Sequence, residues 1–200
     1  MRILLATGNR HKADEVRAIL SGTGITVETL LDRPDLPEPP ETGDTFEHNA
    51  YQKASFIHER LGIPVLADDS GLEVAALDGA PGVHSKRFSP QATHEANNAL
   101  LLQRLHGVTD RRARFRCVLA LVAPGVRAHV SGSCTGRIAT GLRGAGGFGY
   151  DPLFLADDLD GRSMAEASLD EKNAISHRGR AFSQLPELLR AQGLLDPSQG

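Results

Sequence analysis

The apolar positions of the chain fall into short strand-like runs and helix-like stripes. Continuous or alternating apolar residues predict strands at residues 3–6, 25–30, 64–67, 72–74, 113–123 and 126–130, with another short strand within 137–143. Apolar residues three and four apart predict helices within residues 13–20, 45–61, 90–105 and 182–189. This order predicts an α/β fold in which helices flank a mixed, twisted central β-sheet. No repeat or linker divides the sequence, so we expect a single domain over residues 1–200.

Local signals predict where several elements begin. The proline-rich residues 31–43 are expected to form a loop. The next helix is expected to begin at a capping box formed by Asp44 and Glu47, and the one after it at Ser89-Pro90. Asn49 and Lys53 lie four residues apart on the first of these helices, where the pattern alone favours a solvated face.

Two adjacent acids, Asp68 and Asp69, lie between the predicted strands 64–67 and 72–74, and Ser70 follows them. Adjacent carboxylates repel and lose hydration where strands meet, and a divalent metal is the strongest counter-charge for them. The same residues also suit an ordinary acidic turn. This stretch alone leaves both interpretations open.

A strand, a glycine turn and a helix open the chain. The turn reads Thr7-Gly8-Asn9-Arg10-His11-Lys12. A helix start attracts anions through its backbone N–H groups, and Arg10 and Lys12 add positive charge, so the turn is a candidate phosphate site. The Walker pattern is absent, and an ordinary turn with solvated basic residues is the alternative.

A glycine-rich segment, residues 144–152, contains a formal Gly-x-Gly-x-x-Gly match. A dinucleotide fingerprint needs a helix at its last glycine, but Pro152 disfavours helix there, so we reject that interpretation. We expect a loop that approaches a ligand closely, with Phe148 or Tyr150 available to stack on a flat ring. Further along, four residues close together could bind an anion or contact the edge of a base, although each alone is more often a solvated charge: Lys172, His177, Arg178 and Arg180.

Composition narrows the classes of function. The net charge is −3 and the pI is about 6.2, so no basic excess argues for binding duplex nucleic acid. With no Trp and only two Tyr, an aromatic platform for oligonucleotides is not expected. The two cysteines, Cys117 and Cys134, form no disulfide framework. A short apolar N-terminal run and the absence of a long apolar segment lead us to expect a cytoplasmic protein without membrane association.

Together, the acids Glu41, Asp68 and Asp69, the basic turn, further cations and an aromatic glycine loop would suit a nucleotide whose phosphates are bridged by a metal. The chemistry predicted from this set is metal-assisted attack of water on phosphorus.

The sequence also resembles the inosine/xanthosine triphosphate pyrophosphatase family over nearly its whole length. Six blocks in order carry the resemblance: Thr7-Gly8-Asn9-x-x-Lys12, Glu41-Thr42-Gly43-x-Thr45-Phe46-x-x-Asn49-Ala50-x-x-Lys53-Ala54, Ala67-Asp68-Asp69-Ser70-Gly71-Leu72, Gly79-x-Pro81-Gly82-Val83-x-Ser85, Gly147-Phe148-Gly149-Tyr150-Asp151-Pro152 and Glu171-Lys172-Asn173-x-Ile175-Ser176-His177-Arg178-Gly179.

The resemblance implies Mg²⁺-dependent hydrolysis of ITP, dITP and XTP to the monophosphate and pyrophosphate. It also implies two lobes with an active-site cleft between them, and a homodimer. Carried over by position, Glu41 and Asp69 hold the metal, and Asp69 is the catalytic base. The substrate-binding residues it implies are Thr7, Gly8, Asn9, Arg10, His11 and Lys12 for the phosphates, Lys53 and Ser70, Phe148, Gly149, Tyr150 and Asp151 for base and sugar, and Lys172, His177 and Arg178 for the 6-keto edge of the purine.

Some positions depart from the family pattern. Pro40 stands where bacterial relatives often have a first acid, which leaves Glu41 as the only acid directly before Thr42-Gly43. Lys86 is a further candidate substrate contact. A related pyrophosphatase acting on pyrimidine or modified nucleotides is one alternative. A nucleotide sensor without turnover is another, although such a protein would be expected to have lost Asp69, Glu41 or Lys12.

Overall fold

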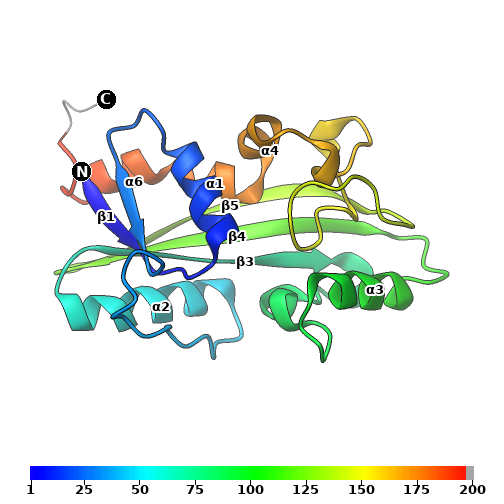
Figure 1. Cartoon of the computed structure of the whole chain (residues 1–200), viewed down its shortest axis with the longest axis horizontal. Coiled ribbons are helices and arrows are strands. Elements are labelled where there is room, and N and C mark those ends of the chain that lie inside the picture. The colour runs from blue at the N-terminus through cyan, green and yellow to red at the C-terminus, as the bar shows by residue number, and fades with distance from the viewer. Residues whose placement is uncertain (197–200) are drawn as a thin grey trace. The chain divides into compact units, whose positions relative to one another are not determined.

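The computed structural model describes residues 1–196, in which six strands form one sheet (Figure 1). The strands are β1 (Arg2–Leu5), β2 (Thr26–Thr29), β3 (Val65–Val74), β4 (Arg112–Ala123), β5 (Val126–Ile138) and β6 (Phe154–Ala156). Their order in the sheet is β2-β1-β3-β4-β5-β6. β1 runs parallel to β2 and β3, whereas β5 and β6 are antiparallel. The prediction of a mixed α/β sheet is therefore confirmed.

The helices follow the apolar stripes of the sequence. They are α1 (Arg10–Ile19), α2 (Phe46–Leu61), α3 (His94–Arg104), α4 (Leu169–Ile175), α5 (His177–Phe182) and α6 (Leu185–Ala191). Short 3₁₀ segments cover Ala75–Leu77, Gly82–Arg87, Asp157–Leu159 and Met164–Glu166. None of the helices within residues 1–196 is long and apolar enough to cross a membrane.

The chain divides into two compact units. Unit 1 contains Met1–Asp69, Cys117–Gly132 and the residues from Arg178 onward, and unit 2 contains Ser70–Arg116 and Ser133–His177. In unit 1, α1 and α2 lie on opposite sides of the sheet (Figure 1). Alternate residues of β1 separate accordingly, because Leu5 packs with Val16 of α1 and Leu4 packs with Ile57 of α2.

Unit 2 has a core of its own. Leu72 of β3, Leu101 of α3 and Phe115 of β4 pack in one apolar cluster with Phe154 of β6. Arg111 closes the end of this core, because its guanidinium donates hydrogen bonds to the carbonyl oxygens of Leu105, Ile138 and Ala139 at 2.7–2.9 Å. A single side chain thus binds the last turn of α3 to the end of β5.

The main correction to the sequence analysis concerns β3. We expected two strands, 64–67 and 72–74, with the two acids between them, but β3 is one continuous strand of ten residues. The interpretation as an acidic turn is wrong, because Asp68 and Asp69 both lie inside this strand. Successive strand residues point to opposite faces, so Asp68 and Asp69 are separated by the sheet and each meets its own cations.

Three smaller predictions were also wrong. The side chain of Thr45, not Asp44, caps α2, by accepting a hydrogen bond from the backbone N–H of His48. α3 begins at His94 with Thr93 as its cap, and not at Ser89-Pro90, because Ala92 adopts a positive φ of 52° that interrupts any earlier helix. No separate strand forms within 137–143, since β5 continues unbroken to Ile138. The loop at residues 31–43 is confirmed.

Candidate functional site

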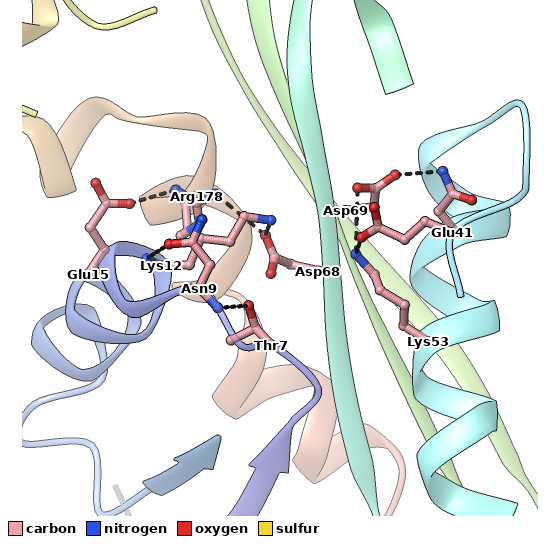
Figure 2. Close-up of polar contacts among 10 residues, drawn as sticks. Thr7, Asn9, Lys12, Glu15, Glu41, Lys53, Asp68, Asp69 and Arg178 are labelled. Atoms are coloured by element: carbon pink, nitrogen blue, oxygen red, sulfur yellow. Dashed lines mark hydrogen bonds and ion pairs between the residues drawn. The ribbon is translucent and has the colours of Figure 1, made fainter. Parts of the chain in front are cut away.

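Asp68 and Asp69 on β3 lie at the centre of two separate polar clusters in unit 1. Figure 2 shows their carboxylates on opposite sides of the strand, Asp68 toward α1 and Asp69 toward α2. Both side chains are buried, at 1% and 6% exposure. Buried carboxylates need hydrogen bonds and counter-charges, and each cluster supplies them.

The Asp69 cluster contains the two predicted metal ligands. Lys53 donates a hydrogen bond from Nζ to Oε1 of Glu41 at 2.5 Å, and the same Nζ lies 3.6 Å from Oδ1 of Asp69. Asn49 donates from Nδ2 to Oδ2 of Asp69 at 3.0 Å. The amide oxygen of Asn49 accepts from the backbone N–H of Gly43, which fixes the end of the loop that carries Glu41. The expectation that Asn49 and Lys53 form a solvated face is wrong, since both are buried.

The electrostatics of this cluster suit a base. Burial raises the pKa of Asp69 above its ordinary value, although Lys53 and Lys12 oppose the rise. A carboxylate with a raised pKa accepts a proton more readily than an ordinary aspartate. For Lys53, burial acts to lower the pKa, but Asp69, Asp68 and Glu41 outweigh it and raise the pKa. Lys53 is therefore a permanent cation beside two acids.

The donor set fits Mg²⁺. Glu41 and Asp69 both approach the ammonium of Lys53, so their carboxylates converge on one cation position. Mg²⁺ usually takes one or two protein carboxylates and completes its shell with waters and substrate phosphates. Residues 1–196 contain no group of three or more acids, histidines or cysteines placed to hold a metal. Asp68 points to the other face and is no ligand for this position.

The Asp68 cluster is an ion-pair network. Oδ2 of Asp68 lies 2.9 Å from Nζ of Lys12 and 3.5 Å from Nη2 of Arg178, and Nη1 of Arg178 donates to Oε2 of Glu15 at 2.5 Å (Figure 2). Burial acts to raise the pKa of Asp68, but Lys12 and Arg178 outweigh it and hold the pKa well below its usual range. Arg178 is only 2% exposed, so the structure places this predicted base-reading residue inside a buried network.

The N-terminal turn has the geometry of an anion site. Asn9 caps α1 by accepting a hydrogen bond from the backbone N–H of Lys12, and Thr7 Oγ1 accepts from the N–H of Asn9. Gly8, Arg10 and His11 are exposed around the same helix start. Since α1 is ten residues long, its N-terminus offers a substantial positive dipole end. The predicted phosphate residues Thr7–Lys12 are thus brought together, and Asp68 orients Lys12 among them.

A second cluster of predicted residues lies in unit 2, around Asp151. Oδ2 of Asp151 accepts hydrogen bonds from the backbone N–H of Phe148 at 2.8 Å and from Nζ of Lys172 at 2.6 Å. The Lys172 ammonium also lies over the Phe148 ring, 4.7 Å from its centroid. One buried carboxylate therefore fixes both the backbone of the glycine loop and the cation on its aromatic ring. The loop contains no helix, as the rejection of a dinucleotide fingerprint required.

The remaining predicted residues lie beside these clusters. Tyr150 is buried, and its hydroxyl donates a hydrogen bond to the carbonyl oxygen of Ser85 at 2.9 Å, which anchors the glycine loop to that residue. His177 is also buried, and its ring stacks on Phe115 with centroids 4.8 Å apart. Gly149 accepts a hydrogen bond from the side chain of Asn98 on α3. Ser70 is half-buried on β3, directly after Asp69.

Gly147 is required by the geometry of the loop around Asp151. It has a φ of +70°, and a Cβ built there would lie 2.2 Å from Oδ2 of Asp151. Gly147→Ala is expected to lower the free energy of unfolding by about 1–3 kcal/mol. It strains the backbone and also displaces the Asp151 carboxylate, which accepts two hydrogen bonds. Chemical denaturation measures the change. Gly141→Ala is the matched control, since it meets no atom within 4 Å and has no positive φ. Equal stability of the two variants would contradict the requirement for glycine at position 147.

Two functional contacts were missed by the sequence analysis. Glu15 shows no local signal for its role, because its partner Arg178 lies 163 residues away along the chain. Asn98 lies on the predicted helix but was not connected with the glycine loop 51 residues later. The spacing of Lys12 and Glu15, three residues apart on one helix, was the only available hint for Glu15.

Comparison with known proteins shows one family to which the sequence and the structure are both similar. Residues 3–188 match the model of the Ham1 family. The chain is 50% identical over 197 residues to a dITP/XTP pyrophosphatase of Geobacter sulfurreducens, covering 96% of this chain and 98% of that protein. Among solved structures, a HAM1 protein from Coxiella burnetii is 39% identical with a TM-score of 0.86 and covers 96% of this chain and 99% of that one. A nucleoside-triphosphatase / dITP/XTP pyrophosphatase from Mycobacterium abscessus is 42% identical with a TM-score of 0.74 and covers 92% and 98%.

Proposed function

This chain belongs to the Ham1 family, and we propose that it hydrolyses the non-standard purine nucleoside triphosphates ITP, dITP and XTP to the monophosphate and pyrophosphate. The observation that carries the proposal is the convergence of Glu41, Lys53 and Asp69, with the pKa of Asp69 raised by burial. Relatives that are about half identical over nearly the whole chain and are named dITP/XTP pyrophosphatases support the same reaction.

In the proposed reaction, water attacks the α-phosphorus of the nucleotide. A bond forms between the water oxygen and phosphorus, the bond from that phosphorus to the bridging oxygen breaks, and pyrophosphate leaves with the bridging oxygen. Asp69 takes the proton from the attacking water. Lys12 and the N-terminus of α1 bind the phosphate oxygens, and Lys53 contributes a fixed positive charge next to the base. Mg²⁺ held by Glu41 and Asp69 would neutralise charge on the triphosphate.

The residues of unit 2 are proposed to bind the base and the sugar. Phe148 offers a ring for stacking, and Asp151 and Lys172 hold that ring and its loop in place. Lys172 and His177 of this unit are donors, and the resemblance adds Arg178 of unit 1. Donors suit the carbonyl at position 6 of hypoxanthine and xanthine. An amino group at this position would meet donor against donor, so adenine is disfavoured.

Pyrophosphate release tests the proposal. We expect release with Mg²⁺ from ITP, dITP and XTP, and much slower release from GTP, ATP and dTTP at equal concentration. Release mainly from a pyrimidine nucleotide would instead favour a related pyrophosphatase. Tight binding of ITP without any release would favour a nucleotide sensor, and would make the Pro40 departure the first position to revert. Either result would overturn the proposed activity.

The remaining expectations are part of the same proposal. A homodimer is tested by sedimentation equilibrium, and Mg²⁺ dependence by activity after chelation and after readdition of the metal. The active-site cleft, the single-domain description and the cytoplasmic location stay predictions.

A further inference from the structure

Helix α3 presents one face to the glycine loop of unit 2. Asn98 donates a hydrogen bond from Nδ2 to the carbonyl oxygen of Gly149 at 2.9 Å. His94 lies four residues earlier, so it occupies the same face of the helix, one turn toward the N-terminus. Its ring accordingly lies beside the Phe148 ring, with centroids 6.2 Å apart and an interplanar angle of 38°. The contact through Asn98 thus holds His94 next to the ring expected to stack on the base.

The surroundings of Phe148 limit where a base can stack. The ammonium of Lys172 lies over one face of the ring, held there by Asp151. A purine is therefore expected to stack on the opposite face, at the separation of about 3.5–4 Å that aromatic carbons adopt. A second ring on the far side of the purine would lie roughly 7 Å from Phe148. The observed separation from His94 is slightly shorter, 6.2 Å, and the rings are tilted by 38°, so the His94 ring has to turn parallel and move outward by about 1 Å to admit a purine. His94 is exposed and is the first residue of its helix.

We propose that His94 is a further base-binding residue, which forms a second aromatic wall so that the purine is held between His94 and Phe148. This inference rests on the proposed function, because Phe148 is the stacking residue only if the ligand is a nucleotide. The sequence analysis did not single out His94, since an exposed histidine at a helix start has no distinguishing pattern.

The test is a set of substitutions at one position. His94→Ala removes the ring and is expected to raise the KM for ITP about 5-fold or more, as loss of a base-stacking aromatic does. The kcat is expected to stay within about 2-fold, since stacking binds substrate and transition state alike. His94→Phe restores a ring and is expected to restore the KM. A merely structural role would not predict rescue by phenylalanine.

Two controls test whether His94 acts on the purine of the nucleotide. One varies the ligand and the other varies the position of the substitution. Inorganic triphosphate lacks a base, so its inhibition constant is expected to be the same for wild type and His94→Ala. His106→Ala removes an exposed histidine just beyond the end of α3 and is expected to leave the KM for ITP unchanged. An unchanged KM in His94→Ala, or an equal weakening of triphosphate inhibition, would overturn the inference.

Failure of the proposed function would look different. A wild-type protein that releases no pyrophosphate from ITP contradicts the reaction, whatever His94 does. In that case, calorimetric binding of inosine monophosphate to wild type, His94→Ala and His94→Phe still decides the inference. Weaker binding in the alanine variant alone supports a stacking role, and equal or absent binding in all three overturns it.

Discussion

Asp69→Asn lowers the kcat for pyrophosphate release from ITP by about 100-fold or more, because it removes both the proposed base and one of two metal ligands. The substitution is nearly isosteric. Folding is expected to remain intact, because burial penalises the charge of Asp69, as its raised pKa shows, and the neutral amide avoids that penalty. Steady-state kinetics with saturating Mg²⁺ and thermal unfolding together measure the two effects.

Glu73→Gln is the matched control for this prediction. Glu73 is an acid on the same strand, β3, but its carboxylate pairs with Arg114 in unit 2 and touches none of the proposed catalytic residues. We expect its kcat to stay within about 2-fold of wild type. Normal turnover by Asp69→Asn would reject Asp69 as the base and would move the search to Glu41, the other acid that reaches Lys53.

Periodicity was enough to predict most elements, but not how the strand with the two acids is built. Leu66 and Leu72 are apolar and buried, whereas Asp68 and Asp69 interrupt the apolar pattern and suggested a turn. The strand continues because buried cations from distant parts of the sequence stabilise each acid on its own face. Single-sequence patterns contain no information about such long-range partners, so the local rule was overridden by tertiary contacts.

In the candidate site, too, local features were predictable from the sequence and long-range contacts were not. The turn at Thr7–Lys12 and the cap at Asn9 were predictable, because a strand, a glycine and a helix start follow one another locally. The burial of Lys53 was not predictable from its helix, since it depends on Glu41 in a preceding loop and Asp69 on a later strand. Resemblance to a family identified these residues, and the structure adds that Asp68 and Asp69 face opposite sides of β3 (Figure 2).

The separation of the two acids assigns them different work. Asp69 lies beside Glu41 and Lys53, the position of the proposed base and metal site, whereas Asp68 pairs with Lys12 and Arg178. We therefore propose that Asp68 acts through Lys12, as a positioning residue for the proposed phosphate site. This division explains how two adjacent carboxylates coexist in a buried strand, since each meets its own cations on its own face of the sheet.

Arg178→Ala is expected to lower the free energy of unfolding by about 3–5 kcal/mol, the usual cost of removing one partner from a buried ion pair. The guanidinium is 2% exposed and contacts both Glu15 and Asp68, so its loss leaves buried acids short of counter-charge. The difference from wild type is expected to narrow as the pH falls below about 4. In wild type the pKa of Asp68 is depressed, and the stability that results is present above the pKa of an unfolded aspartate and lost as the pH falls.

Two further variants show whether the loss of stability comes from the buried ion pair itself. Arg180→Ala removes an exposed arginine from the same helix, α5, and is expected to change stability by less than about 1 kcal/mol. The double variant Glu15→Gln with Arg178→Met is expected to be more stable than Arg178→Ala, because one buried acid is neutralised together with its partner. Urea denaturation of the four proteins measures these differences. If Arg178→Ala were as stable as Arg180→Ala, the buried network of Arg178, Glu15 and Asp68 would contribute nothing to the stability of the fold.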